Sequence, residues 1–104
     1  MLNREIAWHL QTVSVLLELN KEYFFKIKAY RNAAREIKRL PRPVGAMLED
    51  GSLAHVEGIG PCILAMVREL VITGHSSLLE ELSAIRGTEP LVAERVIADQ
   101  NSFI

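Results

Sequence analysis

Apolar side chains recur at the spacing of an α-helix along most of the chain, and proline and glycine divide this pattern into short segments. In residues 4–19 the apolar positions are 6, 10, 13 and 17, with 7 and 16 alongside, which is one face of a helix. A second pattern runs over about 24–40 and ends at Pro41 and Pro43, because proline lacks the backbone N–H that a helix needs. We expect Asn3 to cap the first of these helices.

The rest of the chain is predicted to form shorter helices bounded by glycine, proline or serine. Pro61 suits the first position of a helix, and Gly74 suits the left-handed position after its end. Ser76 or Ser77 is placed to cap the helix that follows, and Gly51 closes the shortest one. The expected helices cover residues 44–50, 61–72, 77–85 and 88–100, with a turn over 52–55. No strand-like alternation competes with this pattern.

Length and composition favour a single small helical domain. The chain has 104 residues, 49% of them hydrophobic, which is enough for one core. We therefore expect an all-α, compact bundle of five to six short helices in one domain over residues 1–104. The single cysteine excludes an internal disulfide, no Cys/His set has zinc spacing, and no apolar run reaches membrane-spanning length. The N-terminus carries frequent charges and is no secretory signal, so the expected compartment is the cytoplasm.

The net charge of −1 hides a strongly basic segment. Residues 21–42 contain eight of the twelve Lys and Arg residues and two of the thirteen acidic residues. On a helical wheel, four of these cations share one face, opposite to the apolar positions 27, 30, 33, 34 and 37. The cations are Lys28, Arg31, Arg35 and Lys38. Two interpretations stay open: an ordinary solvated face, or a surface that contacts the phosphates of a nucleic acid.

The sequence Gly58-Ile59-Gly60 stands directly before the expected helix at Pro61. Glycines allow a tight turn and a close approach to backbone N–H groups, and the N-terminus of a helix favours anions. A Walker loop is excluded because no Lys-Ser/Thr pair follows, and a dinucleotide fingerprint is excluded because Ile63 replaces its last glycine. The turn therefore either binds a phosphate or is an ordinary corner between two helices.

Two motifs together resemble a known family. Residues 55–70, HVEGIGPCILAMVREL, look like a helix-hairpin-helix DNA-binding motif, and residues 25–37, FKIKAYRNAAREI, resemble a signature helix of the N-terminal domain of family X DNA polymerases. The later segment TGHSSLLEEL also resembles a helix of that N-terminal domain. The resemblance covers about residues 3–85, and we expect residues 86–104 to be a helical C-terminal extension. The chain carries no nucleotidyltransferase domain, so we expect no polymerase activity.

The resemblance implies how the hairpin would bind DNA. The main-chain N–H groups of Gly58, Gly60 and Cys62, around Ile59, would hold a backbone phosphate without reading bases. Carbonyl groups of the same turn would coordinate a monovalent cation, Na⁺ or K⁺. By the resemblance these are the carbonyls of Ala54, Val56 and Ile59. No other cofactor is expected.

The resemblance also implies that this chain lacks the lyase nucleophile of the family and part of its basic pocket. Some family members use a lysine as a lyase nucleophile at abasic sites, but Met66 occupies that position here and Cys62 replaces another basic residue of the pocket. Phe25 stands where polymerase beta, a member of this family, has a histidine in the same pocket. Lys26 and Tyr30 match pocket positions that are retained, so part of a site for a 5′-phosphate is expected to persist. Residual lyase chemistry through a remaining lysine, Lys26 or Lys28, is a third and weaker hypothesis.

The expected function is sequence-nonspecific DNA binding linked to DNA repair, at gaps or 5′-phosphate ends, without enzymatic activity and without membrane association. A repair protein is the expected partner. Alternatives are a protein-interaction domain that kept the fold and lost DNA affinity, or the N-terminal piece of a longer polymerase. Cys62 is expected to be a small buried thiol, and an edge formed by Cys62 and Met66 is expected to be covered by residues 86–104.

Overall fold

The computed structural model describes residues 1–83, which contain five α-helices and one 3-10 helix and no strand. The predicted all-α architecture is thereby confirmed. The helices are α1 (Asn3–Leu19), α2 (Phe24–Arg39), α3 (Val44–Glu49), η1 (Ser52–His55), α4 (Pro61–Thr73) and α5 (Ser77–Ser83). The expected helix over 88–100 and the extension over 86–104 lie outside the described residues. No helix of the described part is long and apolar enough to cross a membrane.

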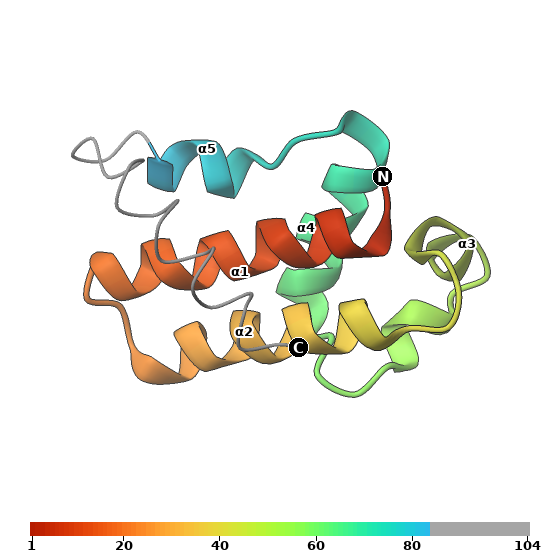
Figure 1. Ribbon diagram of the computed structural model, residues 1–104, viewed down its shortest axis with the longest axis horizontal. Coiled ribbons are helices and arrows are strands. Elements are labelled where there is room, and N and C mark those ends of the chain that lie inside the picture. Colours follow the sequence, from red (N-terminus) through yellow and green to blue (C-terminus); the bar gives the residue numbers. More distant parts are fainter. Residues whose placement is uncertain (84–104) are drawn as a thin grey trace.

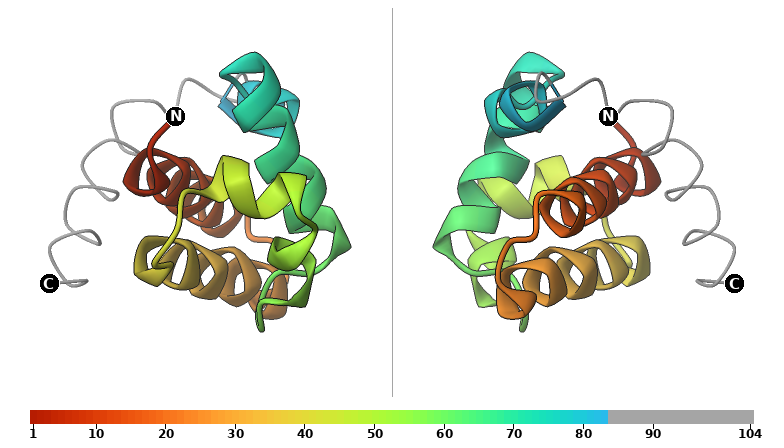
Figure 2. Two further views of the ribbon diagram at one scale, coloured as in Figure 1. Left: turned by 90° about the vertical axis from the view of Figure 1, so that its right-hand side faces the viewer. Right: turned by 90° about the vertical axis from the view of Figure 1, so that its left-hand side faces the viewer.

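The two longest helices, α1 and α2, pack side by side and run in opposite directions (Figure 1). Helix α4 crosses behind this pair, beginning beside α2 and ending beyond α1, and α5 returns along α1. Seen end-on, α3 and η1 lie with α4 on one side of the α1–α2 pair (Figure 2). This arrangement brings the turn before α4 next to α2, which positions the candidate site.

The core lies where α1, α2 and α4 meet. Its fully buried side chains come from the periodic apolar positions of the sequence, and each buried leucine or isoleucine contributes about 1.5–3 kcal/mol relative to an exposed one. The residues with no exposed surface include Ile6, Leu10, Val13, Ile37, Val44, Leu53, Val67 and Leu70. The face predicted for α2 is confirmed, since Ile27, Ala33, Ala34 and Ile37 are buried and Tyr30 is half-buried.

The prediction that Asn3 caps α1 is wrong. Leu2 occupies the N-cap position, and its backbone N–H donates to the Glu5 carboxylate at 2.7 Å. Asn3 is already helical, and its amide instead reaches the connection between α2 and α3. Its Nδ2 donates to the carbonyl oxygen of Arg42 at 2.8 Å, and its Oδ1 accepts from the N–H of Val44 at 2.8 Å. Two such bonds contribute about 1 kcal/mol each and join the start of α1 to the start of α3.

The entry to the hairpin is held by Asp50 at the end of α3. One carboxylate oxygen accepts from the N–H of Ser52 at 2.9 Å, and the other accepts from the Arg42 guanidinium at 2.8 Å. The hydrogen bonds from Ser52, and then that from Arg42, lower the pKa of Asp50 to about 2. Gly51, which lies between Asp50 and Ser52, has a φ of +79°, a left-handed conformation that favours glycine. The chain therefore turns sharply from α3 into η1.

The end of α4 and the start of α5 agree with the sequence-based boundaries. Gly74 follows α4 with a φ of +84°, as expected of a helix C-cap. Of the two candidate serines, Ser76 is the cap of α5: its buried Oγ accepts from the N–H of Leu79 at 3.2 Å. The Glu69 carboxylate accepts from both the N–H and the hydroxyl of Ser77. These bonds lower the pKa of Glu69 and hold α5 against the end of α4.

Candidate nucleic-acid interface

The Gly58–Gly60 turn joins η1 to α4 with a backbone that needs its first glycine. Gly58 has a φ of +92°, a conformation that L side chains rarely adopt. Ile59 between the glycines is 6% exposed and packs into the core, and its N–H donates to the carbonyl oxygen of Val56 at 3.1 Å. Gly60 is the N-cap of α4 with ordinary extended angles, φ −82° and ψ 176°. The turn is thus anchored by one apolar side chain while both glycines face outward.

Three backbone N–H groups of this turn are available to a ligand. Gly58, Gly60 and Cys62 donate to no acceptor within residues 1–83. Pro61 has no N–H, as expected at the first position of a helix. Helix α4 is 13 residues long, so the positive end of its dipole adds to these donors. The arrangement is able to bind an anion such as a phosphate.

The structure places the carbonyls of Ala54, Val56 and Ile59 along the same short stretch of chain. The carbonyl oxygen of Val56 already accepts from the Ile59 N–H, although a carbonyl has a second lone pair. Among the described residues, no cluster of His, Cys, Asp or Glu could hold a metal ion. Any cation at the turn would therefore depend on backbone oxygens.

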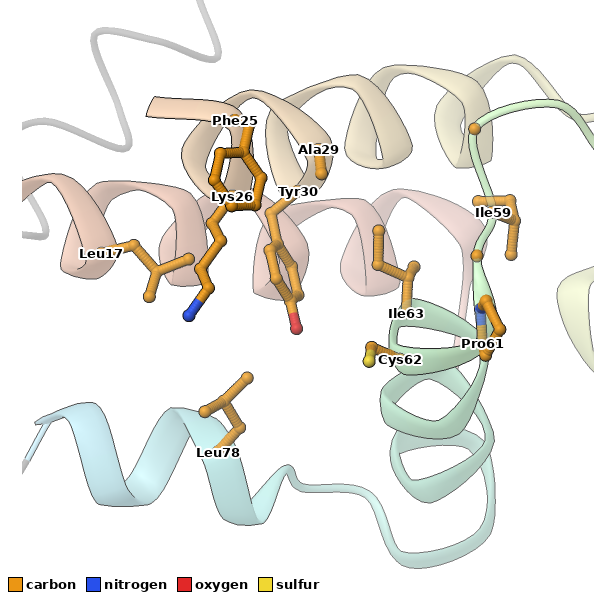
Figure 3. A pocket seen from close by; sticks show the side chains of 12 residues that line it. Leu17, Phe25, Lys26, Ala29, Tyr30, Ile59, Pro61, Cys62, Ile63 and Leu78 are labelled. Atoms are coloured by element: carbon orange, nitrogen blue, oxygen red, sulfur yellow. The ribbon is translucent and has the colours of Figure 1, made fainter. Parts of the chain in front are cut away.

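A groove of about 750 Å³ lies beside the turn, between α2, α4 and α5 (Figure 3). The Lys26 amine, the Tyr30 hydroxyl and the Cys62 sulfur all point into it, and Leu78 of α5 faces them from the opposite side. The groove thus brings together three side chains from α2 and α4, although Tyr30 and Cys62 are 32 positions apart in the sequence. Its lining is mostly apolar: Leu17, Phe25, Lys26, Ala29, Tyr30, Gly58, Ile59, Gly60, Pro61, Cys62, Ile63 and Leu78.

Tyr30 and Lys26, the two groove residues that match pocket positions of the family, have different environments. Burial, and secondarily the neighbouring Cys62, raises the pKa of Tyr30 above its ordinary value of 10.0. The phenol is therefore neutral at physiological pH and can donate a hydrogen bond. Lys26 forms a long ion pair with Glu22, with 3.8 Å between Nζ and the carboxylate. The Lys26 side chain is half-exposed, so its charge is accessible from the mouth of the groove.

The basic face of α2 is narrower than its sequence pattern predicts. Lys28, Arg35 and Lys38 are exposed. Arg31 instead turns toward α1, where its guanidinium lies 3.1 Å from the Glu18 carboxylate and both side chains are about one-third exposed. The ion pair holds Arg31 against α1, which packs along this side of α2. Three of the four predicted cations are therefore exposed, and Arg31 is only partly so.

One carboxylate borders the hairpin. A Cβ added to Gly58 would lie 3.6 Å from the Cγ of Glu36, so the Glu36 side chain of α2 lies close to this glycine. Its carboxylate is 3.9 Å from the Arg39 guanidinium, which offsets part of its negative charge. The N–H groups of the turn, rather than a cluster of cations, are thus the principal attraction for an anion at this point.

Two expectations for α4 are corrected by the packing. Cys62 is exposed at the edge of the groove rather than buried, because its side chain points into the groove and not into the core. Met66, one helical turn later, is 5% exposed and belongs to the core. Cys62 and Met66 therefore form no shared exposed edge. The expectation that residues 86–104 cover such an edge lies outside the described residues.

The most exposed aromatic side chains of the described part lie at the start of α2, and only Phe25 among them is a residue that the family resemblance pointed to. Tyr23, Phe24 and Phe25 stand consecutively at the start of α2 and are 70%, 72% and 67% exposed. A signal was present, because three aromatic residues cannot all face one side of a helix at consecutive positions. At least part of this run had to be solvent-exposed.

Comparison with known proteins agrees with this geometry. Residues 1–76 match the model of a helix-hairpin-helix domain. The chain is also 33% identical over 82 residues to the DNA polymerase/3′-5′ exonuclease PolX of Bacillus subtilis strain 168. That alignment covers 79% of this chain and 14% of the polymerase. The resemblance to family X polymerases expected from the two motifs is confirmed, and the chain spans about one-seventh of this relative's length.

Proposed function

Because this chain belongs to the helix-hairpin-helix domain family, we propose that it binds DNA through the phosphate backbone with little sequence preference. The observation that carries the proposal is the set of three N–H groups, of Gly58, Gly60 and Cys62, that remain without an acceptor in the described structure at the start of α4. Backbone donors at a helix N-terminus favour a phosphate. Contacts to phosphate fix the position of a protein on DNA but carry no sequence information.

The surroundings of the turn suggest how the contact extends. Lys28, Arg35 and Lys38 would add sequence-independent attraction along α2. Lys26 and Tyr30 offer a cation and a hydroxyl donor inside the groove, which supports a preference for a 5′-phosphate at a gap or an end. A Na⁺ or K⁺ ion held by the carbonyls of Ala54, Val56 and Ile59 would bridge the turn to the same phosphate.

Gly60→Val tests this proposal with little risk to the fold. The backbone angles of Gly60 suit a β-branched residue, and a Cβ there meets no atom within 4 Å. The added side chain would stand where a phosphate must approach the turn. We expect DNA affinity to fall about tenfold, the value of one charge-assisted hydrogen bond, while the melting temperature stays unchanged. Fluorescence anisotropy on a one-nucleotide-gapped duplex, with and without a 5′-phosphate and over a salt series, measures the effect.

Gly45→Ala is the matched control, since Gly45 lies in α3 and its Cβ would meet only the Val71 side chain at 3.9 Å. This variant should bind DNA as the wild type does. Equal affinity of the Gly60→Val variant and the wild type would remove the hairpin from the DNA-binding surface. Wild-type affinity that does not fall with salt would exclude a backbone contact altogether.

We propose further that the domain has neither lyase nor polymerase activity. Met66 stands at the position that matches the lyase nucleophile, and a thioether cannot form an imine with an aldehyde. It is also buried in the core. Lys26 is the only amine among the residues that line the groove. Borohydride reduction in the presence of DNA with an incised abasic site should leave no covalent adduct; an adduct that disappears in Lys26→Ala would show that Lys26 has taken over the chemistry.

The relative named above supports a place in DNA metabolism. PolX is a polymerase and a 3′-5′ exonuclease by name, and this chain matches a small part of it. We propose that the domain serves DNA repair, in the cytoplasm at the nucleoid, either with a repair enzyme as its partner or as the N-terminal piece of a longer polymerase.

A protein-interaction domain is the second candidate. It is favoured by the lining of the groove, where Lys26 is the single charged residue among twelve, because the cores of protein interfaces are depleted in charge. This candidate predicts no DNA binding even at the lowest salt concentration, whereas the first predicts binding that weakens steeply as salt rises.

A further inference from the structure

Helix α2 carries a single acidic residue, Glu36, and places it at the hairpin. The helix contains six basic residues and this one acid. A Cβ added to Gly58 would lie 3.6 Å from the Glu36 Cγ, which is ordinary van der Waals contact. The carboxylate is bonded directly to that Cγ, so its negative charge lies beside the turn whose N–H groups are open. An acid at this point opposes the approach of a phosphate and therefore requires an explanation.

The stability of α2 does not explain Glu36. The helix ends at Arg39, so Glu36 lies in its last turn, where the negative end of the helix dipole disfavours a carboxylate. Its carboxylate lies 3.9 Å from the Arg39 guanidinium, and the Arg39 side chain is 71% exposed. Ion pairs this exposed contribute little to stability. The helix itself therefore gains nothing from a carboxylate, rather than an amide, at this position.

Glu36 lies on the side of α2 that faces the groove and the hairpin. Ala29 lines the groove, and Glu36 follows it by seven residues, which puts both on one face of the helix. The exposed cation Arg35 points about 100° away around the helix. The Glu36 side chain is 39% exposed, so solvent screens its charge only in part. A phosphate at the turn would thus approach a partly screened negative charge.

We propose that Glu36 limits the affinity of the hairpin for the DNA backbone, so that the turn by itself does not retain intact duplex. The inference rests on the proposed DNA-binding function and adds what sets its strength. Repulsion between the carboxylate and a nearby phosphate offsets part of the attraction from the three N–H groups. Stable binding then requires DNA that also engages the cations of α2 or the polar groups inside the groove.

Glu36→Gln tests this inference, because glutamine keeps the methylene groups that contact Gly58 and removes only the charge. We expect the variant to bind a blunt duplex about three- to tenfold more tightly than the wild type at low salt, the size of a Coulomb repulsion across a partly solvated gap. The gain should shrink as salt rises, because salt screens the repulsion. The melting temperature should not fall, since the lost charge opposed the helix dipole. Anisotropy titrations of the full chain over a salt series measure the affinity.

A second variant and a matched control locate the effect. In a chain that already carries Gly60→Val, where the phosphate is kept from the turn, Glu36→Gln should add little or no affinity. Glu80→Gln removes the same charge from α5. Glu80 is exposed and lies two positions after Leu78, so it stands on the side of α5 away from the groove. This control should bind the duplex as the wild type does.

Equal affinities of Glu36→Gln and Glu80→Gln for the duplex would overturn the inference and leave the proposed function intact. A gain that persists in full beside Gly60→Val would also overturn it, because the charge would then act away from the turn. A weaker Glu36→Gln variant would show instead that the carboxylate helps to bind DNA, directly or through a cation. Absence of DNA binding by both the wild type and Glu36→Gln at the lowest salt would reject the proposed function itself.

Discussion

Leu53→Ala should lower the free energy of unfolding by about 2–5 kcal/mol, the usual cost of removing a fully buried leucine side chain. Leu53 has no exposed surface and is the one buried residue of η1. It fastens the segment between α3 and the hairpin to the core. Because small domains are stable by only about 5–15 kcal/mol, this variant should melt much earlier than the wild type. Denaturant unfolding followed by circular dichroism measures the change.

His55→Ala serves as the neighbouring control, because His55 lies in the same 3-10 helix and is exposed. A substitution of this kind usually changes stability by less than about 0.5 kcal/mol. If Leu53→Ala cost no more than that, η1 would not be held by the core, and the position of the hairpin beside α2 would need another explanation.

Lys28→Ala/Arg35→Ala should weaken DNA binding by about a hundredfold near 50 mM salt, because each phosphate contact there is worth about one factor of ten, and the salt slope should fall by about 2. The two residues lie seven positions apart on α2, which places them on one face, and both are exposed. Anisotropy titrations over a salt series give both quantities. Unfolding curves should be unaffected, since both side chains are exposed.

Arg31→Ala tests whether DNA binding depends on which cations of α2 are exposed or on the total charge of the helix. It removes one positive charge from the same helix, but the Arg31 guanidinium is engaged by Glu18 at 3.1 Å. Its loss should therefore change the salt slope less than Arg35→Ala does. Equal effects of Arg31→Ala and Arg35→Ala would mean that DNA responds to the charge of the whole segment rather than to an exposed face.

Helix boundaries were largely predictable, because they depend on local chemistry. Pro41 and Pro43 end the second helix, Pro61 begins α4, and Gly74 ends it within one residue of the expected position. The hairpin was predictable for the same reason, since the conformation of Gly58 excludes most other residues.

Side-chain environments were less predictable, because they depend on what packs alongside. Helical spacing puts Arg31 on the basic face, but the neighbouring α1 brings Glu18 within 3.1 Å of it. The sequence pattern also grouped Cys62 with Met66, whereas α4 crosses the α1–α2 pair so that Met66 is buried and Cys62 is exposed. Asn3 was a plausible cap, yet its amide bonds to Arg42 and Val44.

Local chemistry was enough to predict the class of the fold, the helix limits and the glycine turn, because backbone hydrogen bonding and steric limits act over a few neighbouring residues. Which polar groups meet depends instead on how the helices pack against one another. Lys26, Tyr30 and Cys62 share a groove because α4 begins beside α2. The rings of Tyr23 and Phe25 remain exposed because α1 and α4 cover the other side of α2. Burial is a property of the assembled helices, and the local pattern constrains it without specifying which contacts form.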